Sequence, residues 1–182
     1  MSLKLFAVYL GGRAPKCNTE LHDVVFVVGE TIEHTYPQLL EKWFGSPERL
    51  HIDSWVELNV IDGHRVVLKQ EPRTELKKLY FINMGGYRPG EFSELHANAF
   101  LVAANQDEVK RRAKAELLVG MSEVHKDDLF DLDDCLEVRE INGVHVHLEP
   151  TTTTTSLEVH SEYHMIPKAV IAAYMEGRSV LL

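Results

Sequence analysis

A twelve-residue pattern occurs twice in this chain of 182 residues, as GGRAPKCNTELH at 11–22 and as GGYRPGEFSELH at 85–96. A shift of 74 residues aligns the Gly-Gly, the Pro and the Glu-Leu-His of the two copies, together with apolar residues on either side. From Asp53 onwards the matching shift becomes 80 residues, so the second copy carries about six additional residues near 125–132. An internal repeat of this length predicts two copies of one folding unit.

Each copy is typical of a β-β-α-β-β unit. The first strands are apolar runs that end at Gly-Gly, and the second strands are continuous apolar runs, which predicts central strands covered on both faces. A helix follows, with Thr31 and Asn105 as the expected N-caps, although Pro37 favours a late start or a bend in the first helix. A hairpin closes each unit, and Asp62-Gly63 and Asn142-Gly143 predict tight type I′ turns. The expected first strands, second strands, helices and hairpins cover, in the two copies, 5–10 and 79–84, 23–28 and 98–104, 31–45 and 105–120, and 55–68 and 135–148.

We therefore expect an α+β fold built by tandem duplication, with pseudo-twofold symmetry between the two units. The expected divisions are a first repeat at 1–70, a second repeat at 77–150, and a C-terminal extension at 151–182 that packs on the repeats. A charged segment with one proline, 69–78, links the repeats. The threonine-rich start of the extension favours an edge strand over a flexible arm, and residues 165–177 are typical of a short helix.

Composition and charge disfavour several classes of protein. The chain is 45% hydrophobic and 26% charged, which is typical of a globular protein with a sizeable core. Its formal net charge of -9 disfavours nucleic acid as a partner, because an acidic surface repels phosphate. The N-terminal apolar run is short and its pattern returns inside the chain, so we expect neither a signal peptide nor a membrane association. Cys17 and Cys135 do not occupy matching positions of the repeat, which argues against a disulfide framework and for a cytoplasmic location.

The doubled pattern of Gly-Gly-x-x-Pro, followed after four residues by Glu-Leu-His, resembles a bacterial family that is catalogued as a domain of unknown function. Members of that family carry one or two copies of the domain in each chain. The resemblance covers roughly residues 3–150. It implies the duplicated architecture and a bacterial source, and it implies no activity, catalytic residue, cofactor or partner.

The Glu-Leu-His segments are the first candidates for a functional site. In an extended chain residues i and i+2 point to the same side, so Glu20 would lie beside His22 and Glu94 beside His96. Each pair is suited to proton transfer, or to supplying two ligands for a metal ion. If the two corners meet at a pseudo-twofold axis, the four side chains form one cluster. The alternative is that each histidine ties down its own loop by hydrogen bonds to the backbone.

The Gly-Gly segments are the second candidates, because consecutive glycines at a strand end allow backbone N–H groups to converge on an anion. A nearby arginine in each copy adds positive charge. The alternative is that the glycines only allow a sharp exit from the strand, and neither copy matches a phosphate-binding loop. The residues of the anion-binding hypothesis are Gly11, Gly12, Arg13, Gly85, Gly86 and Arg88.

Other histidines provide weaker candidates. The pattern His51-x-Asp53 returns as His125-x-Asp127 under the shift of 74, whereas the shift of 80 breaks the match. His145 and His147 alternate along an expected strand, so they point to the same side. That pair is suited to binding a metal, although an exposed face of the sheet explains both residues more simply.

The sequence supports three hypotheses for function. The first is a non-catalytic small-ligand-binding or regulatory protein with its site at the paired Gly-Gly and Glu-Leu-His loops, because symmetric halves readily form a cleft. The second is a small hydrolase or isomerase that uses Glu94 and His96 as an acid-base pair or within a metal site. The third is a protein-protein interaction module that docks through its threonine-rich edge. A small anionic ligand and a homodimer are the expected partners, and the sequence specifies neither a cofactor nor a metal.

Overall fold

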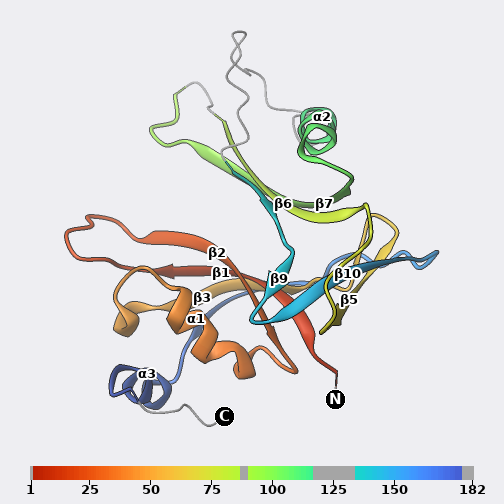
Figure 1. The fold of residues 1–182 in the computed structure, drawn as a ribbon. Helices are drawn as coiled ribbons and strands as arrows, with labels where there is room; N and C mark the ends of the chain where they lie inside the picture. The colour runs from red at the N-terminus through yellow and green to blue at the C-terminus, as the bar shows by residue number, and fades with distance from the viewer. Residues whose placement is uncertain (1, 87–89, 117–133, 178–182) are drawn as a thin grey trace. The chain divides into compact units, whose positions relative to one another are not determined.

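The computed structural model describes residues 2–86, 90–116 and 134–177. Within them the chain forms three antiparallel sheets and three α-helices, so the expected α+β class is confirmed (Figure 1). The pseudo-twofold relation between the repeats stays a prediction. The elements in chain order are β1 Lys4–Gly12, β2 Leu21–Gly29, a 3-10 turn η1 Glu33–Thr35, α1 Tyr36–Lys42, a second 3-10 turn η2 Pro47–Arg49, β3 His51–Glu57, β4 Val60–Ile61, β5 His64–Lys69, β6 Lys78–Gly86, β7 Leu95–Ala103, α2 Gln106–Glu116, β8 Asp134–Glu137, β9 Glu140–Ile141, β10 Val144–Pro150, β11 Val159–Met165 and α3 Lys168–Met175.

The first of two compact units contains β1 to β3, β11, α1 and α3. Its sheet has the strand order β11-β3-β1-β2, and α1 and α3 lie on the same side of it (Figure 1). The alternate residues of β1 that point towards the helices, Phe6, Val8 and Leu10, are all apolar. Burial of one such side chain stabilises the fold by about 1.5–3 kcal/mol. Members of this core include Phe6, Val8, Leu10, Tyr36, Leu39, Leu40, Trp43, Ile52 and Ile166.

The second compact unit contains the sheet β7-β6-β8, with α2 packed over β6 and β7 (Figure 1). It also contains most of a further sheet with the order β4-β5-β10-β9, in which β5 pairs with β10. That pairing joins the hairpin that ends the first repeat to the hairpin that ends the second. The compact units therefore divide the chain differently from the repeats, because β5 belongs to the first repeat by sequence and to the second unit by its contacts.

Within the described residues the second strand of each repeat is an edge strand, which corrects the expectation of a central strand. β2 and β7 each pair with one neighbour, β1 and β6 respectively. The apolar run is nevertheless buried towards the end of each strand. In both strands a side chain from the following helix bonds to backbone groups of the open edge at that point.

In the first repeat the cover is Gln38 of α1. Its Nε2 donates to the carbonyl of Val28 at 2.7 Å, and its Oε1 accepts from the N–H of the same residue at 3.1 Å. In the second repeat Arg112 of α2 donates to the carbonyl of Val102 at 3.1 Å. The Asp62 carboxylate accepts from the N–H of Val102 and from Arg112, both at 2.8 Å. Each of these valines, and each helix side chain that bonds to it, is related to its counterpart by the shift of 74 residues. The two repeats therefore cover the edge at the same position, but with different chemical groups.

We expect Gln38→Ala to lower the free energy of unfolding by about 1–2 kcal/mol, because two backbone groups of a partly buried edge lose their partners. Urea unfolding of the wild type and the variant measures the difference. The control is Gln70→Ala, which makes the same change at an exposed position and should cost less than about 0.5 kcal/mol. Equal effects of the two substitutions would contradict this role for Gln38.

The helix starts follow local chemistry. α1 begins only at Tyr36, after a 3-10 turn, and Thr31 is not its N-cap. The reason is Pro37, which lies in the first turn of the helix, where its missing N–H costs no hydrogen bond. The expected late start is therefore confirmed. α2 is capped as predicted, since Asn105 Oδ1 accepts from the N–H of Glu108 at 2.9 Å.

Two further expectations concern turns and the C-terminal extension. The type I′ turns are confirmed by positive φ angles of 48° and 67° at Asp62-Gly63 and of 52° and 78° at Asn142-Gly143. The expected edge strand is confirmed only as β11, because the threonine run that precedes it forms no strand. There Thr151 Oγ1 accepts from the N–H of Thr153 at 3.1 Å, a local bond that competes with strand pairing. The short C-terminal helix is confirmed as α3.

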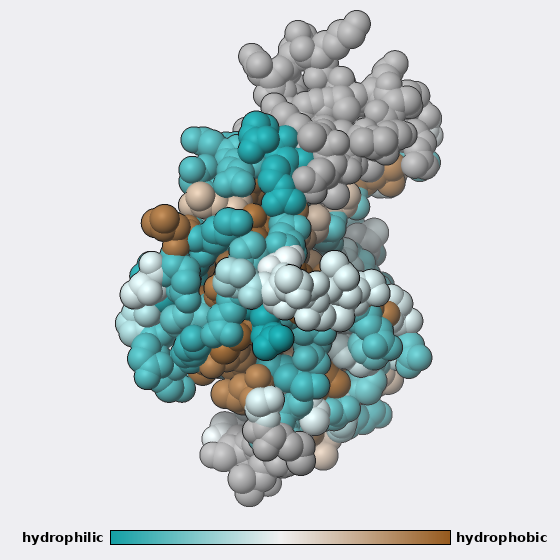
Figure 2. Space-filling model, turned by 90° about the vertical axis from the view of Figure 1, so that its right-hand side faces the viewer, coloured by the Kyte–Doolittle hydropathy of each residue, from teal (hydrophilic) through white to brown (hydrophobic). Residues whose placement is uncertain are grey.

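The face of the molecule in Figure 2 is mostly hydrophilic, and its hydrophobic patches are small and separate. Large hydrophobic side chains with high exposure include Leu76, Phe92 and Tyr163. None of the helices within residues 2–86, 90–116 and 134–177 is both long enough and apolar enough to span a membrane.

Candidate metal-binding site

A glycine between two histidines forms the floor of a site on the first sheet. In the antiparallel register Gly11 of β1 lies opposite His22 of β2 on one side and opposite His51 of β3 on the other. Cross-strand neighbours present their side chains on one face, so the two imidazoles flank a position that has no side chain. A Cβ atom at Gly11 would collide with His51 Nε2 and would lie 2.6 Å from Asp53 Oδ2. The glycine is therefore what allows these groups to lean over the central strand.

Two carboxylates complete the group, and each lies between the two imidazoles. One oxygen of Asp53 is 3.3 Å from His51 Nε2 and the other is 3.3 Å from His22 Nε2. One oxygen of Glu20 is likewise 3.3 Å from His51 Nε2, while the other is 3.9 Å from His22 Nε2. We call these four side chains the Gly11 cluster. The structure thus joins the predicted pair Glu20 and His22 to the pair His51 and Asp53 of the same repeat.

The imidazole of His51 is fixed in one orientation. Its Nδ1 lies 3.2 Å from the carbonyl oxygen of Arg49, which can only accept, so Nδ1 carries a proton. The side chain is 5% exposed. Its Nε2 and the Oδ2 of Asp53 are both buried and have no hydrogen-bond partner. The carboxylate oxygens that lie 3.3 Å from Nε2 are thus close enough to interact but do not meet hydrogen-bond geometry. A buried polar atom without a partner costs free energy unless another group completes the site.

Two tyrosines cover the imidazoles. The ring of Tyr9 stacks on His22 with centroids 5.3 Å apart, and the ring of Tyr163 packs on His51 at 4.4 Å. Burial raises the pKa of Tyr9, and the Asp53 carboxylate raises it further. Tyr163 comes from β11, where an irregularity in the pairing with β3 falls opposite Asp53. A second irregularity, between β3 and β1, falls at the same residue. Bulges of this kind re-aim side chains near functional sites.

The second glycine of the first corner has a different partner. A Cβ atom at Gly12 would lie 2.8 Å from the Trp43 ring and 3.0 Å from the carbonyl oxygen of Arg49, so this glycine makes room for the core. Gly11 and Gly12 thus allow close packing on opposite faces of β1, which supports the structural alternative for the Gly-Gly segment. Arg13, expected to bind an anion, is exposed on the loop that follows.

In the second repeat Glu94 and His96 are 3.7 Å apart, with side chains 34% and 46% exposed. His96 and its neighbour lie opposite Gly85 and Gly86, as in the first repeat. Arg88, the pattern His125-x-Asp127, and the positions that match His51 under the shift of 80 fall outside the described residues. The roles proposed for Glu94, His96, Gly85 and Gly86 therefore stay predictions.

The pair His145 and His147 is neither a shared site nor an exposed face. His147 is buried, which corrects the expectation of exposure. Its Nδ1 lies 2.8 Å from a Glu75 oxygen and its Nε2 2.9 Å from the carbonyl oxygen of Glu71. The reason is that the charged linker folds back onto β10, which sequence periodicity does not reveal. His145 lies 3.7 Å from Glu140.

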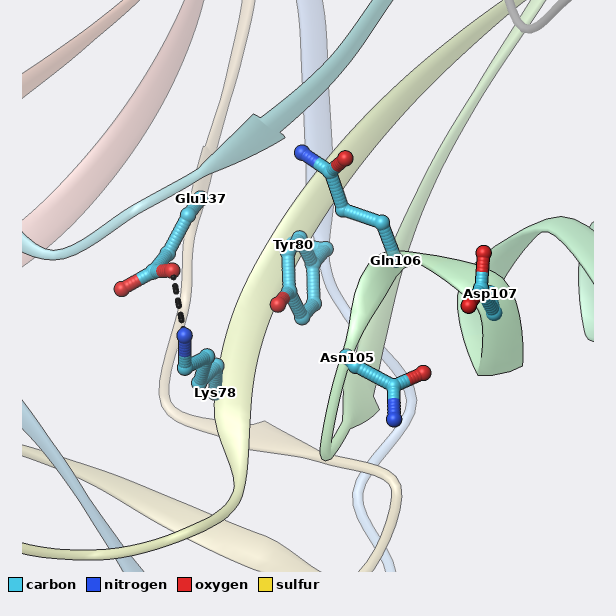
Figure 3. Close-up of a pocket in the computed structure, with 6 residues that line it drawn as sticks. All are labelled: Lys78, Tyr80, Asn105, Gln106, Asp107 and Glu137. Atoms are coloured by element: carbon cyan, nitrogen blue, oxygen red, sulfur yellow. Dashed lines mark hydrogen bonds and ion pairs between the residues drawn. The ribbon is translucent and has the colours of Figure 1, made fainter.

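A hollow of about 370 Å³ lies beside the start of α2 (Figure 3). The ammonium group of Lys78, which lines the hollow, is already paired with Glu137 at 2.9 Å. The side chain of Asn105 is engaged in capping the helix. Burial raises the pKa of Tyr80, another lining residue, so its phenol stays neutral. The hollow thus offers mainly neutral and already paired groups, and we place the candidate site at the Gly11 cluster. The lining residues are Lys78, Tyr80, Asn105, Gln106, Asp107 and Glu137.

Comparison with known proteins agrees with the repeat. The chain matches the family model described as Domain of Unknown Function (DUF1543) in two segments, residues 17–68 and 91–148, which together cover more than half of its length. The chain belongs to this family. The expected two-copy family of unknown function is therefore confirmed, and all four side chains of the Gly11 cluster lie within the first DUF1543 segment.

A solved structure of a similar protein supports the fold. The chain is 37% identical to protein Il1583 from Idiomarina loihiensis, whose crystal structure matches with a TM-score of 0.72. The match covers 92% of this chain and 99% of that chain. No curated protein shows significant similarity to the chain.

Proposed function

We propose that this DUF1543 protein is a ligand-binding protein whose ligand is a divalent transition-metal ion, held by Glu20, His22, His51 and Asp53. The observation that carries the proposal is the buried Nε2 of His51, which faces two carboxylates without a hydrogen bond. With Nδ1 donating to a carbonyl, the neutral form of the ring has its lone pair on Nε2. A nitrogen lone pair beside two carboxylates forms a set of electron donors that a bound cation would stabilise. A histidine that binds a metal usually donates its other ring N–H to a carbonyl or carboxylate oxygen, as Nδ1 of His51 does here.

The spacing of the donor atoms favours a small ion. Zinc binds nitrogen and carboxylate oxygen at about 2.0–2.1 Å, so two ligands of a tetrahedral site lie about 3.3–3.4 Å apart. Three of the four nitrogen-oxygen separations in the cluster are 3.3 Å. Two imidazoles with two carboxylates suit zinc and neighbouring divalent ions better than calcium or magnesium, which prefer oxygen alone. We therefore propose Zn²⁺ as the first ion to test.

The cluster must close to hold one ion. As they stand, no three His, Cys, Asp or Glu side chains in residues 2–86, 90–116 and 134–177 are arranged to hold a metal. In the Gly11 cluster each carboxylate turns one oxygen to each imidazole. Rotation of the two carboxylates about their side-chain bonds brings one oxygen of each towards a common centre.

This proposal revises two parts of the sequence-based hypotheses. The ligand site lies within one repeat and does not require the two Glu-Leu-His corners to meet. The cluster offers lone pairs and negative charge, so it attracts a cation and not the small anion expected for the Gly-Gly loops. The alternative, a hydrolase or isomerase that uses Glu94 and His96, is supported by the short separation of these two side chains.

We expect the purified full chain to bind one Zn²⁺ with a dissociation constant below about 1 μM, equivalent to about 8 kcal/mol. Isothermal titration after treatment with a chelator measures the affinity, and elemental analysis after dialysis measures the stoichiometry. Zinc at a hundredfold excess over the dissociation constant should raise the free energy of unfolding by about 2.7 kcal/mol.

The matched pair of variants is His51→Ala and His34→Ala. His34 is exposed in the turn before α1, so its loss controls for weak binding by any of the ten histidines. We expect His51→Ala to lower the affinity at least about a hundredfold and His34→Ala to leave it unchanged. Unaltered binding in His51→Ala, or no binding by the wild type, contradicts the proposal.

A further inference from the structure

The four side chains of the Gly11 cluster are not held equally. His22 belongs to β2, and His51 and Asp53 belong to β3, so three donors stand on paired strands. Glu20 lies in the loop before β2. It makes the longest of the four contacts, 3.9 Å, and its side chain is the most exposed at 46%. The cluster thus consists of a two-histidine, one-carboxylate set on the sheet and one carboxylate on a loop.

We propose that Glu20 is an exchangeable ligand, and that the metal-loaded site binds a small oxygen-donor anion, a carboxylate or a phosphate, in its place. This inference rests on the metal binding proposed above. Two histidines and one carboxylate leave open positions on a metal ion, and three protein ligands with one exchangeable position distinguish reactive zinc sites from closed structural ones. An incoming anion replaces a carboxylate by a group of the same charge and the same donor atom.

The exposure of the side chains indicates that an anion reaches the metal from the side of Glu20. His51 is buried, and its ring is covered by Tyr163, whereas the side chains of Glu20 and His22 are 46% and 38% exposed. Tyr9 covers one face of His22. The open approach to the cluster is therefore over Glu20. Because the cluster itself supplies only lone pairs and negative charge, the attraction for an anion must come from the metal, and anion binding should be strictly metal-dependent.

The test uses the full chain loaded with Co²⁺, whose visible absorption reports on its ligands. Acetate and inorganic phosphate are titrated as separate arms, with acetamide as the neutral counterpart of acetate. The variants are Glu20→Gln and, as a matched control, Glu41→Gln on the exposed side of α1. We expect Glu20→Gln to retain one Co²⁺ per chain and to bind acetate or phosphate at least about tenfold more tightly than the wild type, a gain of about 1.4 kcal/mol. Glu41→Gln should behave as the wild type, and acetamide should leave the spectrum unchanged.

The outcomes separate the two proposals. Loss of Co²⁺ binding in the wild type overturns both. Binding of Co²⁺ by the wild type, together with a hundredfold loss in Glu20→Gln, shows that Glu20 is a fixed ligand and overturns this inference alone. The same conclusion follows if Glu20→Gln keeps its Co²⁺ but neither anion changes its spectrum. A response to only one of the two anions supports the inference and identifies which chemistry the site accepts.

Discussion

Gly11→Ala is expected to lower the affinity for Zn²⁺ at least about a hundredfold while the chain stays folded. A Cβ atom there would occupy the space of His51 Nε2 and would approach Asp53 Oδ2 to 2.6 Å. Both groups would have to turn away from the point where the proposed ion lies. The backbone of Gly11 is an ordinary strand conformation, which alanine adopts without strain. Zinc titration by calorimetry, with circular dichroism to confirm the fold, measures both parts of the prediction.

Gly12→Ala is the matched control, because it adds the same methyl group one residue later on the other face of β1. Its Cβ would meet the buried Trp43 ring at 2.8 Å and the carbonyl oxygen of Arg49 at 3.0 Å. Overpacking of this kind costs about 1–3 kcal/mol, and the folded fraction should still bind Zn²⁺. If Gly11→Ala binds Zn²⁺ as the wild type does, the proposed position of the metal over Gly11 is wrong.

Glu137→Gln is expected to lower the free energy of unfolding by about 2–4 kcal/mol at neutral pH. Glu137 accepts from Arg73 at 2.6 Å and from Lys78 at 2.9 Å. The Arg73 side chain is 7% exposed, so loss of the carboxylate leaves a buried charge without its counter-ion. Glutamine preserves the volume and one acceptor, which isolates the effect of charge. Urea unfolding in the presence of a chelator measures the difference and removes any contribution from bound metal.

The same variant should be less sensitive to acid than the wild type. Burial raises the pKa of Glu137, but the hydrogen bonds and charges of Lys78 and Arg73 outweigh it, and the pKa lies below its usual 4.5. A carboxyl with a lowered folded pKa stabilises the fold above its unfolded pKa, and that contribution disappears as the pH falls through the folded value. The difference between wild type and variant should therefore shrink below pH 4.5.

A control for the ion pair is Glu149→Gln, whose partner Lys69 lies 3.0 Å away with both side chains 39–49% exposed. Exposed pairs contribute about 0–1 kcal/mol. A comparable loss in Glu137→Gln and Glu149→Gln would show that burial of Arg73 is not what gives the inner pair its strength.

Much of the fold follows from local sequence. The apolar runs before Gly-Gly became β1 and β6, and the Asp-Gly and Asn-Gly turns have the positive φ angles that type I′ requires. Asn105 caps its helix as its side chain predicts. One expectation that failed concerned the position of β2 and β7 within their sheets. An apolar run indicates that both faces of a strand are buried but not whether both of its edges are paired, so an edge strand whose backbone bonds to Gln38 resembles a central strand.

Only half of the candidate site could be predicted from the sequence, because the other half depends on contacts between distant residues. Glu20 and His22 are two residues apart, and their proximity follows from strand geometry. The approach of His51 depends on β3 pairing with the far side of β1, where Gly11 and His51 lie opposite each other although they are 40 positions apart in the chain. One signal was available, since His51-x-Asp53 has the same spacing as Glu20-x-His22. The sequence does not reveal the strand register, which places one pattern on each side of Gly11.

The covered edges of β2 and β7 also bear on how this protein avoids or achieves self-association. A strand that attempted to add to β2 would meet the Gln38 amide at Val28 and the Asp23 carboxylate on the N–H of Val24. Such occupied backbone positions are a defence against edge-to-edge aggregation. The opposite edge of the same sheet is β11, which is almost wholly exposed. A homodimer formed by extending this sheet would therefore grow from β11, and it would bring Tyr163, the neighbour of His51, to the boundary between the two chains.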